Sequence, residues 1–188
     1  MTARARYFLL AALAVVLAGC GYHVAGKGGE MPGGVTEVSI PVFENRTAKP
    51  DIEGVITGAF VNEFNTTVNV TGSAPAVLTG VVKEYNLNAV SYTKSDVNQE
   101  YRLTVVLDLV LTVPAREDGE EDVEYVEVDE DGREVREVLW KDHHVTDYED
   151  FVVNPSDINA TRDAEQTALE KIAEDTARLV KERMLGDF

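Results

Sequence analysis

The stretch from Tyr101 to Val113 constrains the fold more than any other part of the sequence, because apolar residues occupy every second position. These residues are Leu103, Val105, Leu107, Leu109, Leu111 and Val113. Successive side chains of a β-strand point to opposite faces, so the pattern predicts a long strand with one buried face. The other face would carry Arg102, Thr104, Asp108 and Thr112.

Other stretches supply strands that can pair with it. Val77–Tyr92 predicts a long antiparallel neighbour, because the intervening Thr93–Glu100 is short and polar, as in a hairpin loop. Val138–Tyr148 predicts a further long strand. Val35–Phe43 alternates as well, and Pro41 within it cannot donate a hydrogen bond to a sheet. That segment is therefore expected at a sheet edge or at a bulge.

Two segments have helical periodicity. The first opens at Pro50 and Asp51, and its apolar residues recur at spacings of three and four: Ile52, Val55, Ile56, Ala59, Phe60 and Phe64. The second runs from Ile158 to Met184, with Gly186 expected just past its end. Together these elements predict an α+β fold, in which two helices pack on one face of a four-stranded, mainly antiparallel sheet.

An acidic stretch interrupts this pattern between Glu117 and Glu137. Within it, two alternating segments flank Asp129-Glu130-Asp131-Gly132, which is typical of a hairpin turn. We expect residues 116–137 to form a protruding acidic hairpin inserted in a single domain of residues 35–188. A calcium loop is the alternative, but its twelfth position falls on Val138, where a bidentate Glu is required.

His143 and His144 are adjacent in the third long strand. On a regular strand their side chains point to opposite faces, so they are not expected to ligate one metal ion. We interpret them as a polar surface pair, and no metal site is expected anywhere in the chain.

The N-terminus has the features of an export signal. Arg4 and Arg6 precede an apolar run, Tyr7–Ala18, which is too short to span a bilayer. The run ends at Leu17-Ala18-Gly19-Cys20, which resembles a bacterial lipobox. This predicts a signal peptide at residues 1–19 and a lipid-modified Cys20, with thioether-linked diacylglycerol and an acylated (palmitoyl) amino group. Residues 20–34 are rich in glycine and are expected to be a flexible tether.

Composition narrows the possible partners. The net charge is −17, and removing Arg4 and Arg6 with the signal leaves 15 basic against 34 acidic residues, or −19. Such a chain is not expected to bind nucleic acid or anionic lipid surfaces, so membrane attachment would rest on the lipid of Cys20 alone. Because Gly21 rather than Asp follows Cys20, resemblance to lipoprotein sorting rules favours the periplasmic side of the outer membrane.

Catalysis is not expected. Gly26-Lys27-Gly28 lacks the Ser or Thr that completes a phosphate loop, and no nucleophile–base pair is recognisable. With no cofactor motif, the covalent lipid on Cys20 is the only non-protein group expected. A periplasmic scaffold or activator of a cell-wall or other envelope enzyme is one function open to such an anchored α+β domain.

Several motifs resemble the LptE family of lipopolysaccharide-assembly lipoproteins. They are Cys20-Gly21-Tyr22-His23 at the acylation site and Ile40-Pro41-Val42-Phe43-Glu44-Asn45-Arg46-Thr47 in the first strand, followed by Pro50, Ile52-Glu53, Thr57 and Glu63-Phe64. The long C-terminal helix is similar too. The resemblance covers most of Cys20–Phe188.

The resemblance implies a non-enzymatic outer-membrane lipoprotein that plugs the LptD barrel, helps to assemble it and assists lipopolysaccharide delivery to the outer leaflet. Lipopolysaccharide is then a further expected ligand, and family members are thought to contact its phosphates through basic residues near strand ends. Lys94, Arg102 and Lys141 are the candidates here, because they lie near the ends of predicted strands. Ordinary surface charges are the alternative interpretation.

Overall fold

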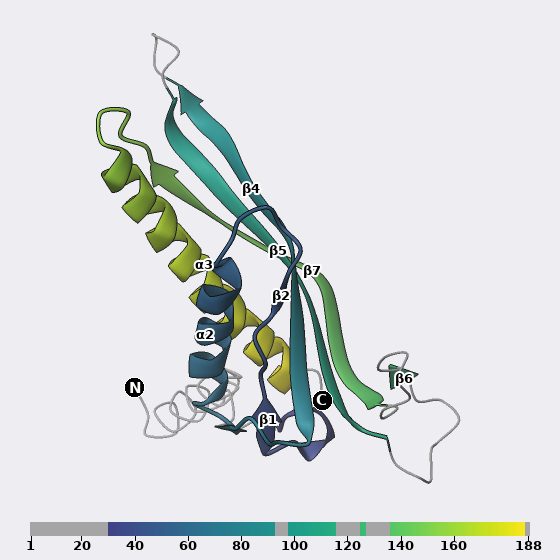
Figure 1. Ribbon diagram of the computed structural model, residues 1–188. Helices are drawn as coiled ribbons and strands as arrows, with labels where there is room; N and C mark the ends of the chain where they lie inside the picture. Colours follow the sequence, from purple (N-terminus) through teal and green to yellow (C-terminus); the bar gives the residue numbers. More distant parts are fainter. Residues whose placement is uncertain (1–29, 93–97, 116–124, 127–135, 187–188) are drawn as a thin grey trace, which may run out of the picture.

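The computed structural model describes residues 30–92, 98–115, 125–126 and 136–186. Within them the chain forms an α+β layer, with one mixed sheet and two long helices on the same side of it (Figure 1). The elements are η1 Pro32–Gly34, β1 Glu37–Ser39, β2 Glu44–Asn45, α2 Ile52–Phe64, β3 Asn69–Val70, β4 Ala76–Tyr92, β5 Asn98–Pro114, β6 Tyr125–Val126, β7 Arg136–Val152 and α3 Ile158–Gly186. The α+β class and the two helices are as predicted.

Three long antiparallel strands form the body of the sheet. β4, β5 and β7 each contain 17 residues, which corresponds to a length of roughly 55 Å. β5 lies in the middle, and its alternation is confirmed by its buried residues Leu103, Val105, Leu107, Leu109 and Leu111. The third strand is longer than predicted, because it continues through Phe151 to Val152. The result is an elongated ribbon that sets the long axis of the molecule.

Short strands complete the sheet at its edges. The strand order is β3-β1-β4-β5-β7-β6, and β2 also pairs with β4. β1 runs parallel to both β3 and β4, and β2 runs parallel to β4. The prediction of four strands was therefore wrong, because the described residues form a mixed sheet of seven. Strands of two or three residues are too short to show a sequence period.

The segment around Pro41 divides the first predicted strand in two. β1 ends at Ser39 and β2 begins at Glu44. In the gap the backbone N–H of Phe43 donates to Thr57 Oγ1 of α2 at 3.0 Å, and the Phe43 ring packs over Gly80 of β4. The irregularity predicted at the proline, an edge or a bulge, is a gap between two short strands, and it directs the Phe43 ring into the core.

The two helices close the core from one side. Phe60 of α2 lies between Phe43 and Phe64, with ring centroids 5.0 and 6.1 Å apart. α3 begins at a true N-cap, because Asp157 Oδ1 accepts the backbone N–H groups of Asn159 and Ala160 at 3.0 Å. Its buried residues recur every three or four positions: Ala168, Leu169, Ile172, Ala173, Thr176, Ala177, Val180 and Met184. The helix extends to Gly186 rather than ending before it.

One predicted boundary changes, at the start of the folded domain. Met31 is only 3% exposed and Pro32 is buried, so the folded domain begins before residue 35 and includes the end of the predicted tether. The predicted acidic hairpin, residues 116–137, lies largely outside the described residues. The structure shows only that Tyr125–Val126 pairs antiparallel with Arg136 and Glu137 at the start of β7.

Candidate interface on the open face of the sheet

The face of β4, β5 and β7 opposite α3 is the part of the domain that the two helices leave uncovered. We call it the open face. Strand register and alternation place polar side chains there from all three strands: Thr79, Asn86, Asn88, Arg102, Thr104, Asp108, Thr112, Lys141, Thr146, Tyr148 and Asp150. Val81, Val106 and Val110 lie among them, so the open face is mainly polar and suits contact with water or with a largely polar partner surface.

Arg102 lies on the open face near the β4–β5 connection. Its guanidinium makes two parallel hydrogen bonds to Asp150 of β7, at 2.7 and 2.8 Å, and lies 4.1 Å above the Tyr148 ring. The hydrogen bonds raise the pKa of Arg102 and lower the pKa of Asp150. Arg102, a predicted lipopolysaccharide contact, is therefore a solvent-accessible cation whose charge Asp150 already balances.

The other two lipopolysaccharide candidates are not gathered around Arg102. Lys141 is exposed on β7, opposite Val110 of β5. Asp150, the partner of Arg102, is nine positions further along β7, a separation of about 25–30 Å. Lys94 lies outside the described residues. Arg102 and Lys141 therefore belong to the same face without forming one site.

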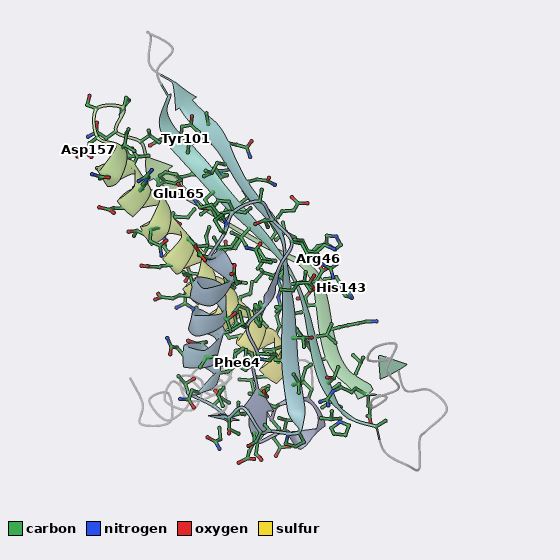
Figure 2. All side chains as sticks on the ribbon, in the orientation of Figure 1. Arg46, Phe64, Tyr101, His143, Asp157 and Glu165 are labelled. Atoms are coloured by element: carbon green, nitrogen blue, oxygen red, sulfur yellow. The ribbon has the colours of Figure 1, made fainter. Side chains whose placement is uncertain are left out.

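The middle of the open face has a cluster centred on Asp108 of β5. Its carboxylate accepts the backbone N–H of His144 at 2.9 Å and lies 3.6 Å from Lys83 Nζ. The hydrogen bond from His144 and the charge of Lys83 hold the pKa of Asp108 below its usual value. The hydrogen bond to Glu44 raises the pKa of Arg46, and the charge of Asp108 adds a smaller contribution in the same direction. Figure 2 shows Arg46 and His143 on the side of the sheet away from α3.

The prediction that His143 and His144 point to opposite faces was wrong. Two residues of β7 oppose the single residue Asp108, and His144 adopts a left-handed backbone conformation with φ of 59°. This bulge breaks the alternation of side chains. Both imidazole Nδ1 atoms consequently lie near the same Asp108 oxygen, at 3.7 and 4.0 Å.

Removing the Asp108 carboxylate should destabilise the bulge. We expect Asp108→Ala to cost about 1–2 kcal/mol at pH 7, because the His144 N–H loses a charged acceptor. A lowered native pKa stabilises the fold above the unfolded-state value, and this contribution is lost as the pH falls through the native pKa. The difference between variant and wild type in urea unfolding should therefore shrink on acidification. Asp150→Ala, which breaks an exposed pair, should cost less; an equal or larger loss would contradict the central role of Asp108.

The Asn45-Arg46-Thr47 stretch separates into structural and exposed parts. The Asn45 amide donates to Lys49 O and Glu53 Oε2 at 2.7 and 2.8 Å, and its oxygen accepts the backbone N–H and hydroxyl of Thr47. These bonds close the loop between β2 and α2. Arg46 has no part in them, because it pairs with exposed Glu44 at 2.7 Å.

The helix side of the sheet has a different arrangement. Glu165 of α3 accepts hydrogen bonds from Tyr85 of β4 at 2.6 Å and from Lys49 at 2.7 Å. Burial alone would raise the pKa of Glu165, but the two hydrogen bonds and the charge of Lys49 outweigh it and lower the pKa. The three groups line a cavity of about 330 Å³ between α2 and α3. Through these hydrogen bonds, Lys49 links the loop before α2 to α3, and Tyr85 links the sheet to α3.

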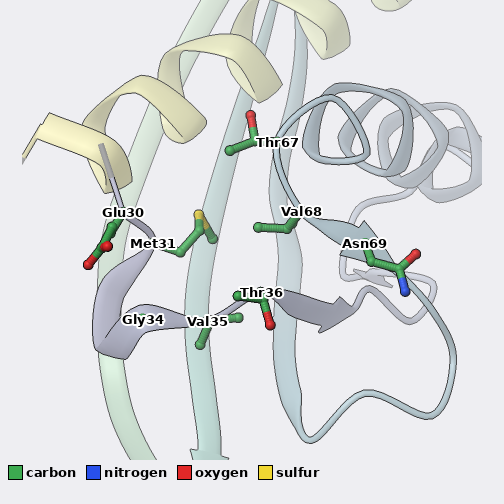
Figure 3. Close-up of a pocket in the computed structure, with 8 residues that line it drawn as sticks. All are labelled: Glu30, Met31, Gly34, Val35, Thr36, Thr67, Val68 and Asn69. Carbon is green, nitrogen blue, oxygen red and sulfur yellow. The ribbon is translucent and has the colours of Figure 1, made fainter. Parts of the chain in front are cut away.

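A second cavity lies where the N-terminal segment enters the domain. It measures about 290 Å³ and is shown in Figure 3. Its lining residues are Glu30, Met31, Gly34, Val35, Thr36, Thr67, Val68 and Asn69. Both cavities have mixed polar and apolar walls.

Among the described residues, no three His, Cys, Asp or Glu side chains are grouped so that they could hold a metal ion. The calcium-loop alternative falls mostly on residues 127–135, which are outside this part of the chain. None of the described helices combines the length and the apolar composition needed to cross a bilayer. Cys20 also lies outside the described residues.

Sequence reasoning missed the Asp108 cluster for an identifiable reason. Alternation placed Asp108 on the solvent face correctly, but bulges at Lys83 and at His143–His144 bring its neighbours together. A bulge leaves little trace in the order of polar and apolar residues. The one available signal was the coincidence of an acidic residue and adjacent histidines in strands expected to pair.

Comparison with known proteins identifies the family. The model of the lipopolysaccharide-assembly family, LptE, matches residues 35–184. Among solved structures, the chain is similar to rare lipoprotein B of Shewanella oneidensis, with 12% identity, a TM-score of 0.47, and coverage of 80% of this chain and 95% of that one. It is also similar to a putative lipoprotein of Caulobacter crescentus, with 14% identity, a TM-score of 0.44, and coverage of 77% and 88% respectively.

No curated protein matches the chain. The family match runs from before β1 to Met184 in α3, and so contains the three long strands of the open face, α2 and nearly all of α3. On the strength of that match, this protein belongs to the LptE family of lipopolysaccharide-assembly proteins.

Proposed function

We propose that this chain is a non-catalytic outer-membrane lipoprotein that occupies the lumen of an LptD barrel, helps to assemble it and assists lipopolysaccharide delivery to the outer leaflet. The observation that carries the proposal, beside family membership, is the shape and polarity of the sheet. β4, β5 and β7 form a rod of roughly 55 Å with a polar open face. The lumen of an outer-membrane barrel is polar, and the apolar band on the outer surface of the barrel is about 25 Å tall. The rod is therefore long enough to extend beyond that band.

The anchor gives the rod an orientation within this proposal. The ten residue steps from Cys20 to Glu30 can span at most about 35 Å, which is shorter than the rod. The end of the domain at η1 and β1 would thus remain near the periplasmic surface. The opposite end, at the β4–β5 connection, would lie deepest in the barrel (Figure 1).

Lipopolysaccharide contact is a separate part of the proposal. Arg102 and Lys141 stay proposed contacts on the open face, as does Lys94 from the sequence. Arg102 is near the deep end in the proposed orientation, where it would have to exchange Asp150 for a phosphate. A guanidinium can form two parallel hydrogen bonds with a carboxylate or with a phosphate, so exchanging Asp150 for a phosphate conserves the number of hydrogen bonds.

Recovery of the partner from native envelopes tests the proposal. The full-length chain, tagged at its C-terminus, is extracted in mild detergent, and the recovered proteins are identified by mass spectrometry. We expect an LptD-like barrel in equimolar amount, and loss of surface lipopolysaccharide when the chain is depleted. Recovery of a cell-wall synthase without a barrel, together with altered wall growth, would instead support a periplasmic activator.

A further inference from the structure

The outer edge of β4 between Glu84 and Ala89 is a stretch of strand without a described neighbour. β1 and β2 pair with β4 only as far as Val82. Beyond that point, the described residues pair with β4 through β5 alone. We call the outer side of Glu84–Ala89 the free edge. An unpaired strand edge presents backbone donors and acceptors that another strand can use.

The direction of the backbone groups can be worked out from the register. The backbone N–H and C=O of Val82 point away from β5, to the outer edge of β4, because the Val82 carbonyl accepts the N–H of Arg46 at 3.0 Å. The bulge at Lys83 shifts the alternation by one residue, since Val82 pairs with Leu107 whereas Glu84 pairs with Val106. The backbone groups of Leu87 and Ala89 therefore point to the free edge, together with those of Tyr85. Those of Asn86 and Asn88 point to β5.

The free edge lacks the features that usually protect strand edges. Proteins guard an edge with bulges, prolines or charges. Bulges interrupt both outer strands: β7 at Leu139 and at His143–His144, and β4 on either side of the free edge, at Lys83 and next to Val90. Between bulges, the regular stretch Val145–Val152 of β7 carries Asp147, Glu149 and Asp150, whereas Glu84–Ala89 carries one charged residue, Glu84 at its end. The near absence of charge along the free edge indicates that it is open for pairing.

The side chains along the free edge specify what a partner strand should offer. Tyr85, Leu87 and Ala89 face the helix side, and Leu87 is 41% exposed there. Asn86 and Asn88 face the open side and can form hydrogen bonds. A complementary strand would therefore be apolar at alternate positions and polar at the others.

Charge decides between a second copy and a different chain. The net charge of −17 makes two copies repel each other, so pairing of β4 with its own counterpart is disfavoured. A partner segment that is uncharged or basic suffers no such penalty. We infer that the free edge of β4 is a strand-addition site for an extended, uncharged or basic segment of the barrel protein. This inference rests on the proposed function.

Proline substitution distinguishes edge pairing from folding. Leu87→Pro removes an N–H that points to the free edge, where proline is tolerated. We expect a cooperative melt close to that of Leu87→Ala, but recovery of the barrel reduced about tenfold relative to Leu87→Ala, as the loss of one or two intermolecular backbone hydrogen bonds would give. Asn88→Pro, which removes an N–H directed at β5, should instead lower the melting temperature.

Hydrogen exchange of the purified complex tests the same site without mutation. The amides of Leu87 and Ala89 should exchange at least about tenfold more slowly in the complex with the barrel than in the free full-length chain. If the barrel is recovered but these amides exchange at the free rate, the inference is wrong and the proposed function stands. If wild type recovers no barrel, the proposed function and this inference both fail. A dimer of the free chain that Leu87→Pro dissociates would show that the occupant is a second copy, and would overturn the assignment to the barrel.

Discussion

A Gly80→Ala variant should be less stable than wild type by about 2–3 kcal/mol, with a melting temperature roughly 5–10 °C lower. A Cβ at this position would lie 2.6 Å from two atoms of the Phe43 ring, closer than carbon atoms can approach without movement. The ring cannot retreat easily. Its backbone N–H is bonded to Thr57, and Phe60 lies against it at 5.0 Å. Urea unfolding followed by circular dichroism measures the change.

Two comparisons make the Gly80 result specific. Gly72→Ala should change the free energy of unfolding by less than about 0.5 kcal/mol, because an added Cβ there meets no atom within 4 Å. Phe43→Leu should cost less in the Gly80→Ala background than in wild type, since a smaller side chain relieves the collision. Additive effects of the two substitutions would show that the ring and the glycine do not oppose each other.

Replacing the signal and Cys20 should move the protein from membrane to soluble extract. With residues 1–20 exchanged for an ordinary cleavable secretory signal, the mature domain carries no acyl chain. Each buried methylene contributes about 0.8 kcal/mol to membrane binding, and several chains together anchor stably. The acidic domain itself offers no attraction to anionic lipid. We therefore expect nearly all of the variant in a detergent-free periplasmic extract, as judged by immunoblot of the fractions.

A second variant separates anchoring from sorting. Gly21→Asp should leave the proposed lipid on Cys20 in place, so we expect this variant in the membrane fraction, but in the inner membrane rather than the outer. Mass spectrometry of the mature N-terminus checks that both acyl groups are present. A wild-type protein with an unmodified Cys20, or a signal-exchange variant that still sediments with membranes, would contradict the lipid anchor.

The long elements were predictable because their periods are uninterrupted. The alternation through Leu103 and Leu109 specified the central strand, and the spacing that includes Phe60 and Phe64 specified α2. Pro41, predicted to lie at a sheet edge or a bulge, lies in the irregular segment between β1 and β2. A strand or helix period becomes visible in the sequence when it repeats over enough residues. A proline is visible as a single residue because it lacks the backbone N–H that a strand needs.

Features that depend on contacts across the sheet were not predictable. The burial of Met31 depends on a core assembled from distant segments, so composition alone suggested a tether there. The closeness of His143 and His144 depends on a bulge that Asp108 stabilises from another strand. The free edge of β4 depends on where β2 ends. The sequence thus predicted which residues of the central strand lie on its polar face, but not how residues of different strands come together there.

The packing of α2 against α3 has a consequence for the order in which the chain can fold. Phe64 is fully buried beneath an assembly that includes Met184 near the other terminus, and Lys181 pairs with Glu63 across the two helices. Because synthesis begins at the N-terminus, α2 cannot bury its aromatic side chains against α3 until α3 has been made. A truncation that removes α3 should therefore leave this aromatic surface exposed, and the variant should not unfold cooperatively.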